Sequence, residues 1–578
     1  MWCEKCQKVT PHDNCEVCGQ KTEPIVPQDI FWCKHCNSPI LRDLSEPQSD
    51  ICPHCHSKMK HLSSDLRPVF PEERLLLEIL TAKPFEYANS SVWANNSRYY
   101  IDGKAISISS DTYSIQNVDH IIEQLNKYQK DNVSRYYEAF NQHISRFVEL
   151  NRTRLNLIEN EAFDFIKKAA QKYSTEQLMI SFSGGKDSTC TEDLTVRALS
   201  NPSIVHVFGN TTLEFPLTIK YVERFRQNNT KVIFKVAKNN EQEFLDVCED
   251  IGPPSRVMRW CCTMFKTGPI TRVINRVYGK GKILTFYGVR KYESTSRSKY
   301  NRLEEHSESV KIQKQSVASP IFYWKDVEVW LYILGNKVDF NDAYRLGYDR
   351  VGCWCCPNNN TRAQFLSRIF MPEQSKIWRD FLIKFAKRIG KPDPEVYVDT
   401  QKWKARQGGS GVAAAEDVKI KYTNCTSETH AKIYELNKPI DDSFLNLFVP
   451  IGKVSKDLGR KLIHEVIVLD PKTNIPIVSI QPFKSPTSEY AVKIKTMNVE
   501  DHTELQRMAS YQVRKFNACR RCLKCESVCK YGAITIIAGN YKINEAKCKR
   551  CKACVTAKYL EGGCLMDKYL KTIKFEQK

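Results

Sequence analysis

The chain has 578 residues, of which 42% are hydrophobic, and its Lys and Arg residues outnumber Asp and Glu by 87 to 66. This length and apolar content predict three or four domains with hydrophobic cores. No apolar run approaches the roughly 18 to 20 residues that cross a bilayer, so we expect a soluble protein with no membrane partner.

The most informative feature is the set of 24 cysteines, of which twenty fall by spacing into five groups of four. Disulfide frameworks are typical of short secreted chains, whereas this chain opens with MWCEKCQK and no signal segment. We therefore expect a cytoplasmic metal protein. The four remaining cysteines are Cys190, Cys248, Cys355 and Cys425.

Metal-bound thiolates would lower the formal net charge of +21 to about +11. The remaining positive charge favours an acidic partner such as a nucleotide, DNA or tRNA, and a generally solvated lysine-rich surface is the alternative.

Residues 1–60 contain four CxxC pairs, joined in twos by spacers of 8 and 15 residues. Such short spacers cannot build a hydrophobic core, so bound metal must supply the folding energy. The spacing predicts two tandem zinc ribbons that hold two Zn²⁺ ions, as docking modules or as nucleic-acid binders. The predicted ligands are Cys3, Cys6, Cys15, Cys18, Cys33, Cys36, Cys52 and Cys55.

Residues 61–150 are predicted to form a small α+β domain of unknown role. A helix should begin at Pro71, which is followed by acidic residues, and a strand pair should turn at Asp102-Gly103. From Asn151 to Lys172 a helical period of apolar residues leads into the apolar strand LMISF.

That strand runs directly into a glycine-containing loop and then into the helix-compatible stretch CTEDLTVRAL. Two glycines let backbone N–H groups turn toward an anion, Lys186 adds a positive charge, and the helix N-terminus adds its partial charge. The pattern predicts a phosphate cradle and differs from the Walker A loop GxxxxGK[ST]; a chance glycine turn is the alternative. The loop residues are Ser183, Gly184, Gly185, Lys186, Asp187, Ser188 and Thr189.

The motif SGGKDS resembles the pyrophosphate (PP) loop of the adenine nucleotide α-hydrolase superfamily. This resemblance implies a doubly wound, mostly parallel α/β sheet of the HUP-like type over residues 151–400, between the zinc ribbons and a C-terminal α+β domain. The segment from Asn210 to Pro216, NTTLEFP, narrows the resemblance to the phosphoadenosine phosphosulfate (PAPS) reductase family. Thr212 stands where that family has glycine, and since β-branched residues resist positive φ, we expect a reshaped turn.

Two further segments match the family: Arg259-Trp260-Cys261-Cys262 with Lys266, and the GxRxxES run from Gly288 to Ser294. The resemblance implies binding of ATP or of PAPS or adenylylsulfate, with Lys186 and Arg290 stabilising phosphate charge and Asp187 acting through Mg²⁺ or by orienting the loop. These three are the expected catalytic residues. The expected cofactor-binding residues are Ser183, Gly184, Gly185, Lys186, Asp187, Ser188, Glu214, Lys266, Gly288, Arg290, Glu293 and Ser294.

The central cysteines Cys261, Cys262, Cys353 and Cys356 resemble the [4Fe-4S] site of sulfonucleotide reductases and of enzymes that put sulfur into DNA or tRNA. Cys355 leaves Cys353/Cys355 open as an alternative pair. If free, Cys355 is either a buried inert thiol or a persulfide carrier. The family's Glu-Cys-Gly-Leu-His segment does not occur here, so sulfonyl transfer lacks its nucleophile unless Cys355 or another protein supplies one.

Residues 405–515 begin with the flexible stretch RQGGSGVAAAED and continue with the strand-like segments HEVIVLD and IPIVSI. They are predicted to form an insert or linker domain of unknown role.

Residues 516–578 contain a CxxCxxCxxxC run that is close to the bacterial ferredoxin pattern, followed by CxxCxxC and a displaced eighth cysteine. In two-cluster ferredoxins the fourth cysteine of each run binds the other cluster. We therefore predict a ferredoxin-type domain with two [4Fe-4S] clusters for electron delivery, three clusters in the whole chain, and zinc as the alternative. The predicted ligand sets are Cys519, Cys522, Cys525 and Cys564, and Cys529, Cys548, Cys551 and Cys554.

Together these features predict an iron–sulfur enzyme that binds an adenine nucleotide and couples ATP-dependent activation to sulfur transfer or reduction, with a nucleic acid as acceptor. A redox partner or sulfur donor protein is implied. The first alternative is an assimilatory PAPS or adenylylsulfate reductase that uses its own ferredoxin domain. The second is a non-enzymatic redox-sensing nucleic-acid binder, against which the intact SGGKDS loop argues.

Overall fold

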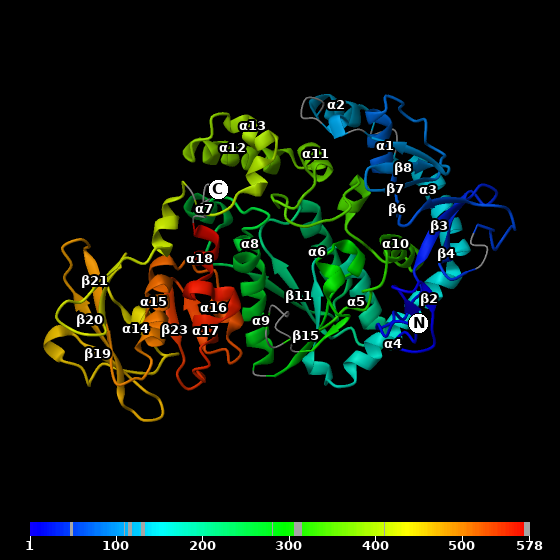
Figure 1. Cartoon of the computed structure of the whole chain (residues 1–578). Coiled ribbons are helices and arrows are strands. Elements are labelled where there is room, and N and C mark those ends of the chain that lie inside the picture. Colours follow the sequence, from blue (N-terminus) through cyan, green and yellow to red (C-terminus); the bar gives the residue numbers. More distant parts are fainter. Residues whose placement is uncertain are drawn as a thin grey trace.

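A computed structural model describes residues 1–46, 50–108, 110–113, 118–128, 133–279, 281–305, 312, 315–409 and 411–571. Its centre is a six-stranded sheet in the order β12-β11-β10-β13-β15-β14, with helices on both faces (Figure 1). All neighbouring strands are parallel except β14, which pairs antiparallel with β15. The expected mostly parallel α/β fold is confirmed. The strands are β10 (Leu178–Phe182), β11 (Val205–Asn210), β12 (Ile233–Lys238), β13 (Ile283–Phe286), β14 (Leu303–Glu304) and β15 (Gln315–Ala318).

Alternating side chains of β10 supply two separate cores, as expected for a strand buried on both faces. Ile180 packs in the layer of α4 (Arg152–Ala170), α5 (Lys186–Leu199) and α10 (Asp326–Gly335). Met179 packs on the other face, where α9 (Gly268–Tyr278) contributes Ile270 and Ile274. The carboxyl ends of β10, β11 and β13 therefore meet at one edge of the sheet.

The N-terminal part forms small antiparallel sheets beside this core. The hairpin of β1 and β2 precedes a three-stranded sheet, and a four-stranded sheet follows with the predicted turn at Asp102-Gly103. Gly103 has φ +77°, and a Cβ atom there would lie 2.3 Å from Trp32, so the second ribbon rests directly on this turn. The strands are β1 (Trp2–Cys3), β2 (Lys8–Val9), β3 (Gln28–Cys33), β4 (Ser38–Asp43), β5 (Lys60–Ser63), β6 (Arg67–Pro68), β7 (Val92–Asn95), β8 (Arg98–Ile101) and β9 (Lys104–Ser107).

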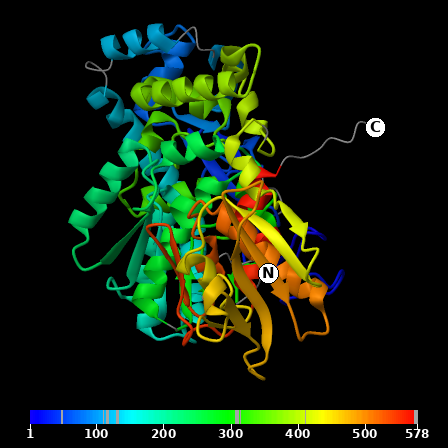
Figure 2. The ribbon, with the colours of Figure 1, turned by 90° about the vertical axis from the view of Figure 1, so that its left-hand side faces the viewer.

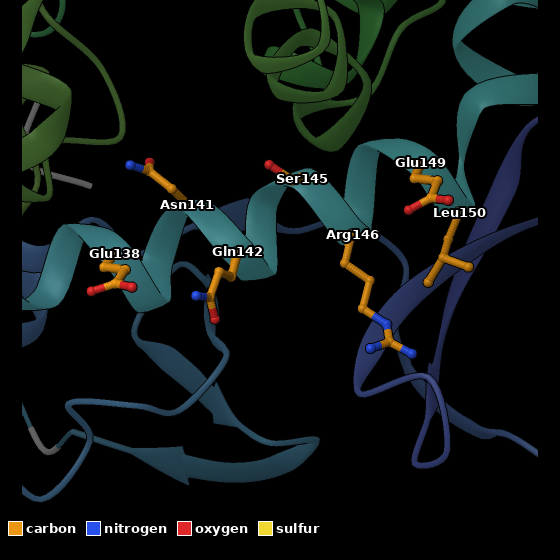
Figure 3. A pocket seen from close by; sticks show the side chains of 7 residues that line it. All are labelled: Glu138, Asn141, Gln142, Ser145, Arg146, Glu149 and Leu150. Atoms are coloured by element: carbon orange, nitrogen blue, oxygen red, sulfur yellow. The ribbon is translucent and has the colours of Figure 1, made fainter.

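Helix α1 (Pro71–Leu80) begins at the predicted proline, and α2 (Val118–Tyr128) and α3 (Val133–Leu150) follow. A surface hollow runs along α3, as Figure 3 shows, and contains no predicted site residue. Its lining residues are Glu138, Asn141, Gln142, Ser145, Arg146, Glu149 and Leu150.

Residues 422–496 form a six-stranded antiparallel sheet in the order β16-β17-β21-β20-β19-β18. Figure 2 shows it beside the C-terminal segment, and Phe444 of α14 (Asp442–Asn446) meets Phe516 of α15 (His502–Ala518) at 4.9 Å. Helix α15 crosses the predicted domain boundary at residue 515. The strands are β16 (Tyr422–Asn424), β17 (Ala431–Leu436), β18 (Lys453–Ser455), β19 (Val466–Leu469), β20 (Pro476–Phe483) and β21 (Tyr490–Thr496).

The remaining helices connect these parts. The C-terminal segment adds the hairpin of β22 (Ile534–Ile537) and β23 (Asn540–Ile543). No helix in the described ranges has both the length and the apolar character to cross a membrane. The other helices are α6 (Pro216–Asn228), α7 (Phe244–Ile251), α8 (Trp260–Cys262), α11 (Thr361–Phe370), α12 (Pro372–Arg388), α13 (Pro394–Asp399), α16 (Lys524–Val528), α17 (Ala553–Thr556) and α18 (Leu565–Leu570).

Candidate functional site

The predicted phosphate loop lies between the end of β10 and the start of α5. Gly184 adopts the left-handed conformation with φ +71°, which glycine adopts at little cost. The Ser188 hydroxyl donates to the Gly185 carbonyl at 2.8 Å and accepts from the Ser183 N–H at 3.1 Å. These bonds fold the loop over the helix N-terminus, where an anion is favoured.

Two cations and two carboxylates meet beside this loop. Lys186 Nζ lies 3.0 Å from an Asp326 oxygen and 3.4 Å from an Asp187 oxygen. Arg290 pairs with the same two carboxylates, at 2.8 Å from Asp326 and 2.5 Å from Asp187. Lys186 and Arg290 are only 3% and 5% exposed. Burial alone would raise the pKa of Asp187, but Arg290 and Lys186 hold it at about 2. Both cations are thus charged and aimed at the loop.

Asp326 is a site residue that no sequence motif predicts. It is the first residue of α10, and in the sequence it stands out only as a charge that interrupts an apolar segment. The carboxylate of Asp65 accepts hydrogen bonds from the Asp326 and Val327 N–H groups, both at 3.0 Å, so the segment between β5 and β6 caps this helix. Burial and the nearby Asp326 raise the pKa of Asp65 to about 6.

Two further unpredicted residues hold the loop from the other side. The Lys186 N–H donates to the Tyr344 hydroxyl at 3.0 Å, and Asn341 Nδ2 donates to the Gly184 carbonyl at 3.0 Å. One loop amide that was expected to face an anion is therefore already bonded to Tyr344.

The GxRxxES segment packs tightly on the phosphate loop. A Cβ atom on Gly288 would lie 2.5 Å from the backbone of Asp187, so only glycine allows this approach. The Arg290 N–H donates to Glu293 at 3.1 Å, and Glu293 also pairs with Arg297. Ser294 is exposed and accepts a hydrogen bond from the Arg297 N–H at 3.2 Å, so its described contact is local.

The turn after β11 holds a β-branched residue in a conformation that such a residue was expected to resist. Thr212 has φ +66° despite its branched side chain. Its N–H donates to Asn210 Oδ1 at 2.8 Å, and the neighbouring Thr211 N–H donates to both Glu214 oxygens at 3.1 Å. These surrounding bonds stabilise a conformation that Thr alone disfavours.

This turn lies against the cysteine loop. Glu214 and Cys353 form an isolated antiparallel bridge, and the Trp354 N–H donates to the Leu213 carbonyl at 2.9 Å. Thr211 Oγ1 lies 3.6 Å from Cys353 Sγ. The carboxyl edge of the sheet therefore carries the phosphate loop and the central cysteines together.

The other two central cysteines lie in α8, next to a π-helical turn that carries Lys266. Arg259 donates to Cys262 Sγ at 3.4 Å. A hydrogen bond from Cys261 and the cations Arg259 and Lys266 hold the pKa of Cys262 well below its ordinary value, although burial opposes this. Such a thiol is easily ionised, as a metal ligand must be.

Cys355 has different surroundings from Cys353 and Cys356. It is 3% exposed and lies in the hydrophobic core with Cys248 and Trp260, and burial raises its pKa well above the ordinary value. Cys353 and Cys356 are half-buried.

In the described part of the chain, only the two N-terminal cysteine groups bring three or more ligand atoms within 4.8 Å of one another. Zn–S bonds of about 2.3 Å in a tetrahedron imply S–S distances near 3.8 Å. The Cys36–Cys52 and Cys3–Cys18 sulfurs lie 3.8 and 3.5 Å apart. Both groups fit a four-thiolate metal site, as predicted for zinc ribbons.

The two C-terminal CxxCxxC loops share one backbone conformation. Arg521 and Arg550 have φ of 52° and 49°, and Leu523 and Lys552, two positions later, both have φ 59°. A short helix follows each loop. Cys529, Cys548, Cys551 and Cys554, which form one predicted ligand set, line a single cavity. Within the described residues neither C-terminal set brings three sulfur atoms within 4.8 Å of one another, so cluster binding by these loops stays a prediction.

The C-terminal segment contacts the central site directly. Leu523 lies on Gly268, where an added Cβ would be 2.6 Å from Leu523 Cβ. Glu526 of α16 pairs with Arg272 of α9 at 2.8 Å. Tyr569 and Cys261 both pack against the hydrophobic cluster that contains Cys522, and burial together with the thiols of Cys522, Cys262 and Cys261 raises the pKa of Tyr569 to about 12.

Comparison with known proteins finds one family model for the central part. A family model of the phosphoadenosine phosphosulfate reductase domain matches residues 177–359. This region, about a third of the chain, is therefore similar to PAPS reductase domains. The match contains the phosphate loop, the Glu214 turn and all four central cysteines.

Individual proteins are similar to parts of this chain, and the chain spans little more than half the length of the first two relatives. Uncharacterized protein MJ0066 of Methanocaldococcus jannaschii is 30% identical over 273 residues, which are 47% of this chain and 55% of that protein. The chain spans 60% of a second relative from this organism, MJ0973. Adenosine 5'-phosphosulfate reductase of Staphylococcus epidermidis is 25% identical over 227 residues, 37% of this chain and 86% of that enzyme. PAPS reductase from Candida auris is 19% identical with a TM-score of 0.28, and the match covers 37% of this chain and 96% of that structure.

Proposed function

We propose that this chain is an iron–sulfur enzyme that binds an adenine nucleotide at its PP-loop and couples ATP-dependent activation to sulfur transfer or reduction at the central cysteines. The observation that carries the proposal is the backbone bridge between Glu214 and Cys353. It joins the turn after β11 to the cysteine loop, so activation and sulfur chemistry share one edge of the sheet.

The residues of the loop have separate roles in this proposal. Lys186 and Arg290 bind the nucleotide's phosphates and stabilise the charge that develops during cleavage of the α–β bond. An incoming phosphate competes with Asp326 for both cations, and Asp187 is then available to hold Mg²⁺ or to keep Arg290 oriented. Glu214 holds the Thr211 turn, and Gly288 permits the close approach of the Arg290 segment.

The cysteines divide into three kinds of site in this proposal. Four thiolates from Cys261, Cys262, Cys353 and Cys356 bind the central [4Fe-4S] cluster, which supplies electrons or a sulfur-binding iron when present. The buried Cys355 is a packing residue. The two C-terminal groups hold two further clusters, and the N-terminal groups hold two Zn²⁺ ions.

A second candidate is an adenylylsulfate or PAPS reductase that draws electrons from its own C-terminal segment. The similarity to the S. epidermidis reductase over 86% of that enzyme favours it. Against it, the sequence has no Glu-Cys-Gly-Leu-His segment and so lacks the cysteine of that segment.

The acceptor in the first candidate is DNA or tRNA, because the cations beside Cys262 are exposed. Arg256, Arg259 and Lys266 all face solvent near the central cysteines. Cations on the surface can contact the backbone phosphates of a nucleic acid.

An anaerobic comparison of ATP, adenylylsulfate and PAPS as substrates tests the proposal, with pyrophosphate and sulfite measured as products. Pyrophosphate from ATP alone supports the first candidate. Sulfite from adenylylsulfate or PAPS supports the second. Formation of neither pyrophosphate nor sulfite, together with tight nucleic-acid binding, would support the non-enzymatic alternative.

A further inference from the structure

The two C-terminal cysteine groups differ in their access to solvent. In the group of Cys529, Cys548, Cys551 and Cys554, Cys551 is exposed and two others are half-buried. In the group of Cys519, Cys522, Cys525 and Cys564, three are buried. The buried group is the one that approaches the central site, through the contact of Leu523 with Gly268 and through the hydrophobic cluster shared by Cys522, Tyr569 and Cys261.

Positive charge surrounds the exposed group. Residues 530–556 contain six Lys or Arg residues and one carboxylate, Glu545, which pairs with Arg550 at 3.1 Å. Within the described ranges, none of the four exposed lysines next to these cysteines forms an ion pair. These four, which we call the lysine rim, are Lys530, Lys547, Lys549 and Lys552.

The buried group has the opposite surroundings. Its neighbouring cation Arg520 pairs with both Asp250 and Asp417. Lys515, also beside this group, is 2% exposed and donates to the Cys554 carbonyl. In the described ranges an approaching protein therefore meets four exposed lysines without an ion pair at the exposed group, whereas Arg520 and Lys515 beside the other group are paired or buried.

We propose that the lysine rim is the docking surface for an acidic one-electron carrier protein, which delivers electrons at the Cys551 side. This inference rests on the cluster sites of the proposed function. One electron leaves the reduced carrier, which is oxidised by one electron, and reduces the site of Cys529, Cys548, Cys551 and Cys554; no bond forms or breaks. It then passes to the buried group and past Leu523 and Tyr569 to the central cysteines.

The alternative use of a lysine rim is nucleic-acid binding. The observations favour a redox protein, because the rim lysines adjoin predicted cluster ligands in the sequence, and Lys549 and Lys552 line one cavity with Cys551, the exposed thiol among those ligands. Opposite charges on two proteins raise association rates most at low ionic strength, which gives the proposal a kinetic signature.

The test uses the full chain, anaerobically purified with its clusters, and a reduced acidic flavodoxin as probe. The double variant Lys549→Glu/Lys552→Glu is compared with Lys461→Glu/Lys472→Glu, which changes lysines far along the chain in the antiparallel sheet region. Stopped-flow absorbance follows cluster reduction by flavodoxin and, separately, by titanium(III) citrate. Iron content is measured for every variant.

We expect reduction by flavodoxin to be about tenfold slower in the rim variant at low salt, and unchanged in the control variant. Reduction by titanium(III) citrate should be equal in all three proteins. Equal rates with flavodoxin, or a wild-type rate that does not fall with salt, would overturn the proposal. Loss of tRNA binding by the rim variant with unchanged flavodoxin kinetics would assign the rim to RNA instead. The docking proposal also requires iron in the C-terminal sites, so wild-type protein without iron there would overturn it. This outcome does not depend on whether pyrophosphate or sulfite is formed.

Discussion

Leu523, between two predicted cluster ligands, packs directly on Gly268 at the start of the helix that follows Cys261 and Cys262. A methyl group on Gly268 would lie 2.6 Å from Leu523 Cβ. The C-terminal cysteine segment is therefore fixed against the central site by a contact that leaves no room for a larger residue.

Gly268→Ala should destabilise the protein by about 1 to 3 kcal/mol, the usual cost of overpacking a close contact. It should also slow electron transfer from the C-terminal segment to the central site. Denaturant unfolding and freeze-quench spectroscopy measure the two effects. Gly281→Ala is the matched control, because its nearest new contact would be 3.3 Å away. Equal stability of the two variants would contradict the close packing.

Asp326→Asn should lower the free energy of unfolding by about 3 kcal/mol, because it leaves Lys186 and Arg290 with one carboxylate between them. ATP should recover part of this loss, since phosphate replaces the missing charge. Urea unfolding with and without ATP measures both. The half-buried Asp342, which pairs with Arg224 and Arg345 near the surface, provides the control: Asp342→Asn should cost under about 1 kcal/mol. A loss at Asp326 no larger than at Asp342 would count against the charge cluster.

Lowering the pH should remove the contribution of Asp187 to the free energy of unfolding. Its pKa is depressed to about 2, so the stabilisation is complete above its ordinary pKa near 4 and is lost as the pH falls toward 2. The full contribution is about 2 kcal/mol. The stability difference between wild type and Asp187→Asn should therefore shrink between pH 5 and pH 3. A difference that stays constant over this range would show that Asp187 is not held ionised by Arg290.

Metal analysis separates the cysteines of the central loop. Anaerobically purified protein should contain about 12 iron and 2 zinc ions per chain. Cys356→Ser should remove about four iron ions, whereas Cys355→Ser should remove none, because Cys355 packs in the core. The reverse result would favour the Cys353/Cys355 pair. Iron near 8 with zinc near 3 would assign zinc to the central site.

The sequence predicts those parts of the site whose evidence is local. The residues of the phosphate loop are consecutive, so the strand, the glycine turn and the helix could be predicted from one stretch of sequence. The structure has all three. The N-terminal metal groups were equally predictable from CxxC spacing.

Long-range contacts could not be predicted in this way. The fold brings three residues that are distant in sequence to the phosphate loop, namely Asp326, Tyr344 and Asn341. No motif in the surrounding sequence predicts this contact for any of them. The positive φ of Thr212 could not be predicted either, because it depends on the surrounding hydrogen bonds and not on the residue's own preference. The predicted boundary at residue 515 lies inside α15, because one helix packs on both neighbouring parts.

The central claim is that the PP-loop activates an adenine nucleotide, and pyrophosphate release by Lys186→Ala tests it most directly. Lys186 is buried and charged beside the loop, whereas Lys472→Ala changes an exposed lysine in a distant turn. The account predicts that Lys186→Ala abolishes ATP-dependent pyrophosphate release and that Lys472→Ala leaves it unchanged. Equal release by Lys186→Ala and wild type would contradict the account.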